Sequence, residues 1–188
     1  MTSTPRSYFE EIYREEADPW EFESSPYEKR KYDVTIASLP RFRYRSAYEP
    51  GCSIGVLTEL LAPRCDRLLS TDIVPCALQR AQRRLRRAPH VQIQEHSIPD
   101  QWPVGLFDLV VLSEIAYYFD VTDLDSVMAR VMESTILGAH IVAVHWRGET
   151  NYPLTAERSH RIIGNTFGLD TIVHHVEEEF VLDVWERH

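Results

Sequence analysis

Apolar residues near the start of the chain recur at helical spacing. Residues 8–13 place their apolar side chains on one face of a helix, and the pattern is interrupted at Asp18-Pro19-Trp20. A second helix is predicted from about Pro26, because proline is tolerated in the first turn of a helix. We expect residues 1–40 to form a helical cap on a larger domain that spans residues 41–188.

Short apolar runs then alternate with amphipathic helical segments. The predicted strands are 47–49, 68–73, 90–96, 107–112, 141–144, 170–176 and 180–185. The predicted helices are 56–61, a segment starting at Pro75, 122–136 and 154–167. This alternation predicts an α/β fold with a doubly wound, mostly parallel, seven-stranded sheet. The last two strands have no helix between them, so they are expected to form an antiparallel hairpin.

The composition and charge of the chain argue against several classes of protein. The 188 residues are 44% hydrophobic and 26% charged, which is ordinary for a globular protein. The formal net charge of -9 argues against nucleic-acid binding, because phosphate binding needs a positive surface. There is neither an apolar run of the ~20 residues that a membrane span needs nor the apolar core of a secretory signal. We expect a cytoplasmic monomer or homodimer.

The cysteines and histidines do not suggest a metal site. The three cysteines, Cys52, Cys65 and Cys76, are widely spaced and odd in number, which is typical of free thiols in a reducing compartment. Metal ligation by His174 and His175 is not expected.

A glycine-containing turn, residues 49–55, follows the first predicted strand. Its sequence is Glu49-Pro50-Gly51-Cys52-Ser53-Ile54-Gly55. Glycine lets the backbone turn sharply and approach a ligand closely, and the helix that follows presents free N–H groups. Asp72 ends the second predicted strand, where a carboxylate is placed to bind ribose hydroxyls. The dinucleotide fingerprint fits poorly, because the positions of its second and third glycines hold Ser53 and Val56.

Pro50 is an unusual residue at the end of a central strand. It removes one backbone donor, and the preceding Arg43-Tyr44-Arg45 is polar where a buried strand would be apolar. The first strand is therefore predicted to be short or locally weakened.

The glycine turn, Asp72 and the segment from Phe107 to Glu114 resemble the class I S-adenosylmethionine-dependent methyltransferases. The resemblance implies S-adenosylmethionine as the cofactor. It implies that the turn lies under the methionine part, that Asp72 binds the ribose, and that His96 and its neighbours approach the adenine. The cofactor-binding candidates in the domain are Glu49, Gly51, Cys52, Ser53, Gly55, Asp72, Ile73, Ser97, Ile98 and Ser113.

Several short segments also resemble the nodulation N-methyltransferase (NodS-like) family. They are Asp18-Pro19-Trp20, Ser25-Pro26-Tyr27-Glu28, Tyr32-Asp33, the glycine turn and Ser113-Glu114-Ile115-Ala116-Tyr117-Tyr118-Phe119. The resemblance covers the chain from about Asp18 onward. It implies methyl transfer to the amine of an amino sugar or chitooligosaccharide-like acceptor. We also expect Trp20, Tyr27 and Tyr32 to cover the cofactor as part of a helical lid.

Methyl transfer from a sulfonium is an in-line displacement, so the enzyme mainly aligns the methyl group with a neutral amine. An ammonium cannot attack, so a base is needed. Glu114 and His145 are the candidates because both end predicted strands, although packing of His145 under Trp146 is an equal alternative. The substrate-binding candidates are the aromatic and polar residues that follow these strands: Tyr117, Tyr118, Trp146, Arg147, Glu149 and Tyr152.

Two alternatives to N-methylation stay open. An O-methyltransferase would need a stronger base, since a hydroxyl is far less acidic than an ammonium. A cofactor-binding protein without catalysis is favoured slightly by Pro50 and the polar first strand.

Overall fold

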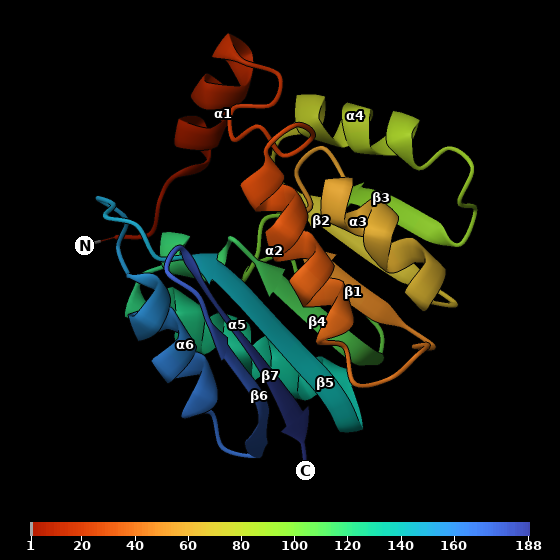
Figure 1. Cartoon of the computed structure of the whole chain (residues 1–188), viewed down its shortest axis with the longest axis vertical. Coiled ribbons are helices and arrows are strands. Elements are labelled where there is room, and N and C mark those ends of the chain that lie inside the picture. Colours follow the sequence, from red (N-terminus) through yellow and green to blue (C-terminus); the bar gives the residue numbers. More distant parts are fainter. Residues whose placement is uncertain (1) are drawn as a thin grey trace.

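Seven strands form one sheet, in the order β3-β2-β1-β4-β5-β7-β6, in the computed structural model, which describes residues 2–188 (Figure 1). The strands are β1 (Ala47–Pro50), β2 (Leu68–Asp72), β3 (Val91–Glu95), β4 (Phe107–Ser113), β5 (Thr135–Trp146), β6 (Leu169–Val176) and β7 (Phe180–Arg187). Adjacent strands are parallel from β3 to β5, and β7 is antiparallel to both of its neighbours. The predicted sheet and its antiparallel C-terminal hairpin are confirmed.

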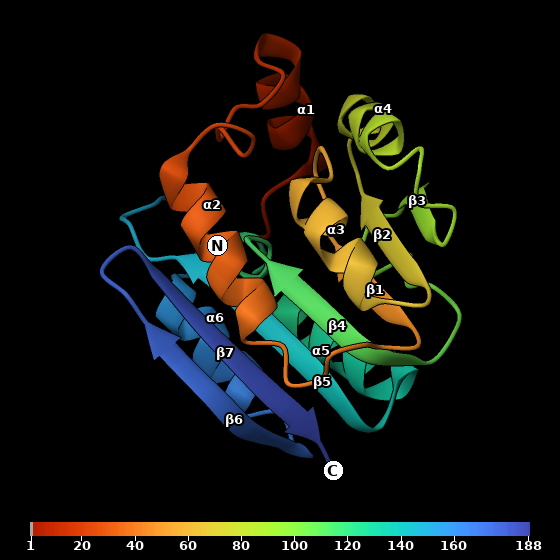
Figure 2. The same cartoon turned by 45° about the vertical axis from the view of Figure 1, so that its right-hand side comes forward.

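Six α-helices flank this sheet. They are α1 (Arg6–Glu15), α2 (Pro26–Ala37), α3 (Val56–Leu61), α4 (Pro75–Arg84), α5 (Val121–Ser134) and α6 (Ala156–Gly164). Two 3-10 turns, η1 (Ala62–Arg64) and η2 (Ala116–Tyr118), complete the elements used below. Helices α2, α3 and α4 cover one face of the sheet, whereas α5 and α6 cover the other (Figure 2). No helix of the described residues is apolar over the length that crossing a bilayer requires.

The alternation of side chains along β4 divides the core into two layers. Leu109 and Val111 pack in the cluster that contains the apolar side of α3. Val110 and Leu112 pack in the cluster that contains α5 and α6. A strand buried on both faces is typical of a parallel sheet, because helices cover both of its sides.

Strand β5 begins earlier than predicted. The predicted helix 122–136 ends at Ser134, and β5 runs without a break from Thr135 to Trp146. The first part of β5 pairs at Phe107↔Thr135, and the register then shifts before it resumes at Leu109↔His140. The apolar periodicity did not reveal this irregular extension, which accounts for the misplaced boundary.

Pro50 does not interrupt the pairing of β1 with β2, although the strand is only four residues long. The pairing with β2 continues to Pro50↔Thr71, and the Gly51 N–H donates to the Thr71 carbonyl at 2.7 Å. Successive N–H groups alternate sides, so the Pro50 nitrogen faces β4, where the pairing ends at Tyr48↔Val110. The short strand is confirmed. The N–H group that Pro50 lacks would lie beyond the last residue pair between β1 and β4, so no hydrogen bond of the sheet is lost.

The N-terminal segment is fastened across the carboxyl ends of the strands. The Thr4 N–H donates to the Tyr118 carbonyl at 2.8 Å, and Arg6 forms an ion pair with Glu95 of β3 at 2.8 Å. Further along α1, the Tyr13 hydroxyl is hydrogen-bonded to Ser53. The segment from Thr4 to Tyr13 therefore connects η2 with the glycine turn.

Candidate functional site

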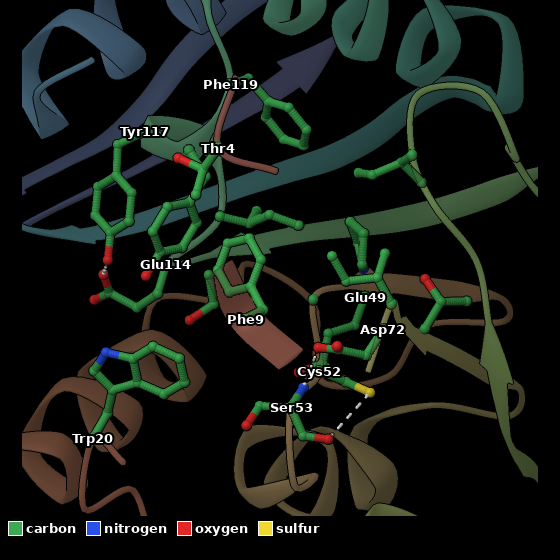
Figure 3. A pocket seen from close by; sticks show the side chains of 18 of the residues that line it. Thr4, Phe9, Trp20, Glu49, Cys52, Ser53, Asp72, Glu114, Tyr117 and Phe119 are labelled. Atoms are coloured by element: carbon green, nitrogen blue, oxygen red, sulfur yellow. Dashed lines mark hydrogen bonds between the residues drawn. The ribbon is translucent and has the colours of Figure 1, made fainter. Parts of the chain in front are cut away.

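A cavity of about 710 Å³ lies at the carboxyl ends of the parallel strands. Open α/β sheets place their ligands at this edge, outside the ends of the strands. Residues of α1, α2, the glycine turn and the loop after β4 line the cavity. Figure 3 shows Glu49 and Asp72 on one side of it, and Glu114 and Tyr117 on the other.

Most of the predicted site residues meet in this one cavity. Its lining includes Trp20, Tyr27, Tyr32, Glu49, Gly51, Cys52, Ser53, Asp72, Ile73, Ser97, Ile98, Ser113, Glu114, Tyr117, Tyr118, Trp146 and Tyr152. The roles assigned to them stay predictions, but their shared location is a property of the structure.

The glycine turn has the backbone conformation that its sequence suggests. Gly51 has φ +75°, and a Cβ there would lie 2.7 Å from Ile115 Cδ1. Ser53 is also left-handed, with φ +52°, and its N–H donates to Asp72 Oδ2 at 2.9 Å. The turn is thus tied directly to the end of β2. The thiol of Cys52 lines the cavity in neutral form, since burial raises its pKa well above the usual range.

Asp72 supplies acceptor oxygens at the end of β2. Its Oδ1 accepts a hydrogen bond from the Val74 N–H at 2.9 Å, and its Oδ2 accepts the one from Ser53. A carboxylate has about four lone-pair sites, so these two bonds leave acceptor capacity for a ligand. Burial raises the pKa of Asp72, and the backbone N–H donors oppose that rise.

Glu49 is a buried acid beneath the turn. It is 2% exposed, and its Oε2 accepts hydrogen bonds from the hydroxyls of Thr58 at 2.6 Å and Ser70 at 2.7 Å. Burial raises the pKa of Glu49 to about 7. The two hydroxyls use one oxygen of the carboxyl, while the residue itself lines the cavity.

His96 follows β3 and contributes an unused polar atom. It lines the cavity, and its Nδ1 is buried without a hydrogen-bond partner among residues 2–188. Buried polar atoms in native structures are nearly always paired, so an unpaired one beside a cavity suggests a ligand partner.

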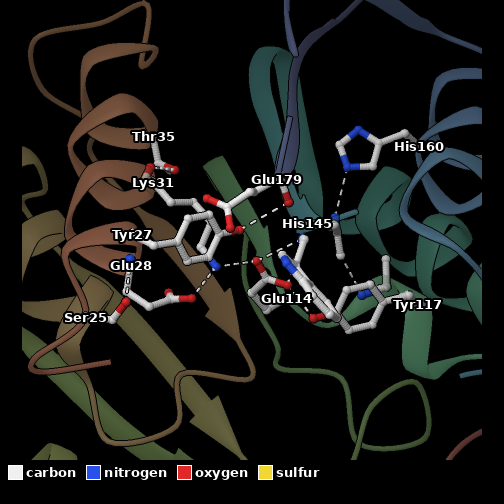
Figure 4. Close-up of polar contacts among 12 residues, drawn as sticks. Ser25, Tyr27, Glu28, Lys31, Thr35, Glu114, Tyr117, His145, His160 and Glu179 are labelled. Carbon is white, nitrogen blue, oxygen red and sulfur yellow. Dashed lines mark hydrogen bonds and ion pairs between the residues drawn. The ribbon is translucent and has the colours of Figure 1, made fainter. Parts of the chain in front are cut away.

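A buried ion-pair network crosses from α2 to the end of β4 (Figure 4). Lys31 is 1% exposed, and its Nζ lies 2.8 Å from Glu28 Oε1 and 2.5 Å from Glu114 Oε1. Burial lowers the pKa of Lys31, but the two carboxylates outweigh it, and the net pKa is raised. Glu114 has φ +53° and also accepts a hydrogen bond from the Tyr117 hydroxyl. Lys31 is therefore an ammonium held between two acids.

His145 lies outside the cavity, which corrects its predicted role as a base. It is 0% exposed, and its Nε2 accepts the Ala116 N–H at 2.9 Å. Its Nδ1 is 2.9 Å from His160 Nε2, and His160 Nδ1 is 2.6 Å from Asp183 Oδ2. Burial also lowers the pKa of His145 well below its usual range. Both ring nitrogens are occupied, so His145 has no free atom to take a proton from a ligand.

Three other candidates also lie outside the cavity. Gly55 begins α3 at φ +81°, and a Cβ there would lie 3.0 Å from Ala81 Cβ, so this glycine serves helix packing. Arg147 pairs with Glu157 at 2.8 Å. Glu149 lines a separate pocket beside the N-terminal segment.

Several residues of the cavity wall are not predicted by the sequence patterns. Lys31 and Glu28 lie one helical turn apart on α2, a spacing that is usually found on an exposed face. Phe9 and Tyr13 of α1 also line the cavity. Their spacing predicts a helix, but it does not distinguish a helix that packs on a sheet from one that covers a cavity.

The fold and the site together define a class of protein. A sheet in the order β3-β2-β1-β4-β5-β7-β6 with an antiparallel β7, and acids at the carboxyl ends of β1 and β2, is the class I methyltransferase fold. The chain belongs to the nodulation protein S (NodS) family, whose model matches residues 10–141. Groups of three or more potential metal ligands are absent from the part of the chain that the structure describes.

Individual relatives agree with this assignment. Nodulation protein S of Rhizobium tropici is 32% identical over 127 residues, which are 66% of this chain and 53% of that protein. Nodulation protein S of Bradyrhizobium diazoefficiens is 33% identical over 126 residues, which are 61% and 56% of the two chains. The aligned region thus spans little more than half of these relatives. The structure of the N-methyltransferase NodS from Bradyrhizobium japonicum WM9, in complex with S-adenosylhomocysteine, superposes with a TM-score of 0.86 at 26% identity and covers 97% of this chain and 98% of that one.

Proposed function

We propose that this protein is an S-adenosylmethionine-dependent N-methyltransferase that acts on the amine of an amino sugar or chitooligosaccharide-like acceptor. The observation that carries the proposal is that two acids, Glu49 and Asp72, line the main cavity next to the turn at Gly51 and Ser53, both of which have positive φ. The NodS structure in complex with S-adenosylhomocysteine supports the choice of cofactor.

The residues present fit S-adenosylmethionine. Asp72 would accept the ribose hydroxyls with the lone pairs that Ser53 and Val74 leave free. Glu49 would accept a hydrogen bond from the amino group of the methionine part, and the unpaired Nδ1 of His96 would contact the adenine. Ile73, Ser97 and Ile98 would complete the wall around the nucleoside.

The other half of the cavity suits a sugar-like acceptor. Tyr117 and Tyr152 lie at 5.1 Å between ring centroids, and Tyr118 and Tyr152 at 4.6 Å. Aromatic faces bind both apolar sugar surfaces and cationic groups. Together with Trp146, they form an aromatic wall next to Glu114.

The bound cofactor would supply a methyl group on a positively charged sulfur. Loss of the methyl group would leave the sulfur as a neutral thioether. The protein must then exclude water, align the acceptor nitrogen and remove its proton. Helices α1 and α2 cover the cavity, and the network of Lys31, Glu114 and Tyr117 fixes its wall. We place Glu114 in this positioning role.

The test is to incubate the purified protein with S-adenosylmethionine and a panel of amino sugars, their N-acetylated forms and hydroxyl acceptors. Mass spectrometry should find S-adenosylhomocysteine together with N-methylated amino sugar. Methylation of hydroxyl acceptors alone would favour an O-methyltransferase. Binding of the cofactor without any methylated product would favour a cofactor-binding protein without catalysis. Asp72→Ala should weaken cofactor binding by calorimetry about tenfold or more, whereas Asp66→Ala, an exposed acid paired with Arg43, should not.

A further inference from the structure

One carboxylate oxygen in the wall of the cavity lacks a well-formed hydrogen bond. Glu28, on α2, is 6% exposed, and its Oε1 is paired with Lys31 at 2.8 Å. Its Oε2 is buried and has no well-formed hydrogen bond within residues 2–188, although a weak hydrogen bond from the Tyr32 hydroxyl to the carboxyl lowers its pKa. The residue lines the main cavity, and its carboxyl lies beside the ammonium of Lys31 (Figure 4).

An unpaired buried carboxylate oxygen is costly. Leaving a buried acceptor unsatisfied costs about 1–3 kcal/mol, and more when the group is charged. Native structures keep few such groups, and those that they keep need an explanation. Because Glu28 lines the cavity, a donor on a bound ligand would complete the hydrogen bonds of this oxygen.

Glu114 offers no comparable vacancy. Its Oε1 is bonded to Lys31, its Oε2 to the Tyr117 hydroxyl, and the Trp146 N–H lies 3.1 Å from both oxygens. Three donors therefore bind this carboxylate, and one of them is shared, so both oxygens are already hydrogen-bonded. Of the two acids that flank Lys31, Glu28 is the one with an oxygen that lacks a well-formed hydrogen bond.

The charge balance points to a cationic ligand. Lys31 supplies one positive charge between two carboxylates, so the ionised cluster carries one uncompensated negative charge in a buried setting. The rings of Tyr27 and Tyr32 lie 4.9 Å and 5.9 Å from Lys31 Nζ, which gives this region a lining that favours cations. A second ammonium would balance the charge and satisfy Oε2 together.

We propose that Glu28 Oε2 binds the protonated amine of the acceptor and takes its proton before methyl transfer. The N–H bond breaks, the nitrogen keeps the bonding electron pair, and an O–H bond forms on Glu28. The carboxyl releases this proton to water after the product leaves. Burial raises the pKa of Glu28, which makes it a better proton acceptor than an exposed carboxylate, while Lys31 opposes the rise. This inference rests on the proposed N-methyltransferase function.

The test compares Glu28→Gln with the native protein. Glutamine keeps an oxygen for Lys31 but replaces the free acceptor with a donor. The probes are glucosamine and its uncharged counterpart N-acetylglucosamine, titrated by calorimetry into protein saturated with S-adenosylhomocysteine. The control variant, Asp33→Asn, removes an exposed carboxylate from the same helix, where it pairs with Lys29.

The native protein and Asp33→Asn should bind glucosamine at least about tenfold more tightly than N-acetylglucosamine. Glu28→Gln should lose this preference, bind S-adenosylhomocysteine normally, and turn over about 100-fold more slowly at saturating glucosamine. Glu28→Asp, which keeps the charge, should recover part of the preference. The inference is overturned if Glu28→Gln retains the preference, or if the native protein has none. Failure of the native protein to bind S-adenosylhomocysteine would instead count against the proposed function.

Discussion

Replacing Glu49 with glutamine isolates the effect of a buried acid beneath the glycine turn. Glutamine has nearly the same shape, and its carbonyl can still accept the hydrogen bonds that Thr58 and Ser70 donate to Glu49 Oε2. The substitution removes only the ionisation. We therefore expect the difference in stability between the two proteins to depend on pH.

The magnitude follows from the raised pKa of Glu49. Its pKa is 4.5 in the unfolded reference and about 7 in the folded protein, where burial disfavours the charged form. A raised folded pKa gives stability that is fully present below about pH 4.5 and is lost as the pH rises through about 7. One pKa unit corresponds to about 1.4 kcal/mol, so the native protein should lose about 2.5 kcal/mol relative to Glu49→Gln between pH 5 and pH 8.

Urea unfolding, followed by tryptophan fluorescence at pH 5, 6.5 and 8, measures this difference. Glu133→Gln is the control, because its carboxylate lies on an exposed part of α5, at 66% side-chain exposure, and pairs only with Arg130 among the described residues. The stability of this control should follow that of the native protein at each pH. Parallel pH profiles for Glu49→Gln and the native protein would refute the reasoning and show that Glu49 ionises normally in the fold.

Two further substitutions test the packing and the charge network. Gly55→Ala should lower the free energy of unfolding by about 1–3 kcal/mol, since it adds a Cβ 3.0 Å from Ala81 at φ +81°. The control is Gly138→Ala, which has a similar φ of +74° but places its Cβ near only the end of the Arg41 side chain, at 3.4 Å, and should therefore cost less. Equal losses of stability in the two variants would contradict the packing argument. Lys31→Met should cost about 3–5 kcal/mol at pH 7 in urea unfolding, because it leaves two buried carboxylates without their cation. A loss below about 1 kcal/mol would contradict the buried ion pairs.

The sequence was sufficient to predict the sheet, because its strongest signals are local. The run from Phe107 to Leu112 is apolar at almost every position, and β4 is accordingly buried on both faces. The turn at Gly51 and the acid at Asp72 are likewise defined by short spacing. These features depend on the backbone conformation of a few neighbouring residues, which sequence patterns represent well.

The missed parts of the site depend on contacts between distant segments. His145 follows Ile141 and Ala143 on the face of β5 that packs in the α5 and α6 layer, whereas Trp146 reaches the cavity. The sequence predicts both residues at the end of a strand, but it does not show which face of that strand is covered by helices. Lys31 is similar, because only the approach of Glu114, 83 residues away, turns an ordinary helix position into a buried ion pair.

The hydrogen-bonded histidines behind the cavity have a fixed direction of proton donation. Because the Ala116 N–H donates to His145 Nε2, the proton of His145 must reside on Nδ1 and point to His160. His160 must then carry its own proton on Nδ1, directed at Asp183, which also contacts the exposed His174 at 2.6 Å. Neither ring can change tautomer alone without setting two donors or two acceptors against each other. The backbone of η2 is thus coupled through two imidazole tautomers to a carboxylate on the outer hairpin.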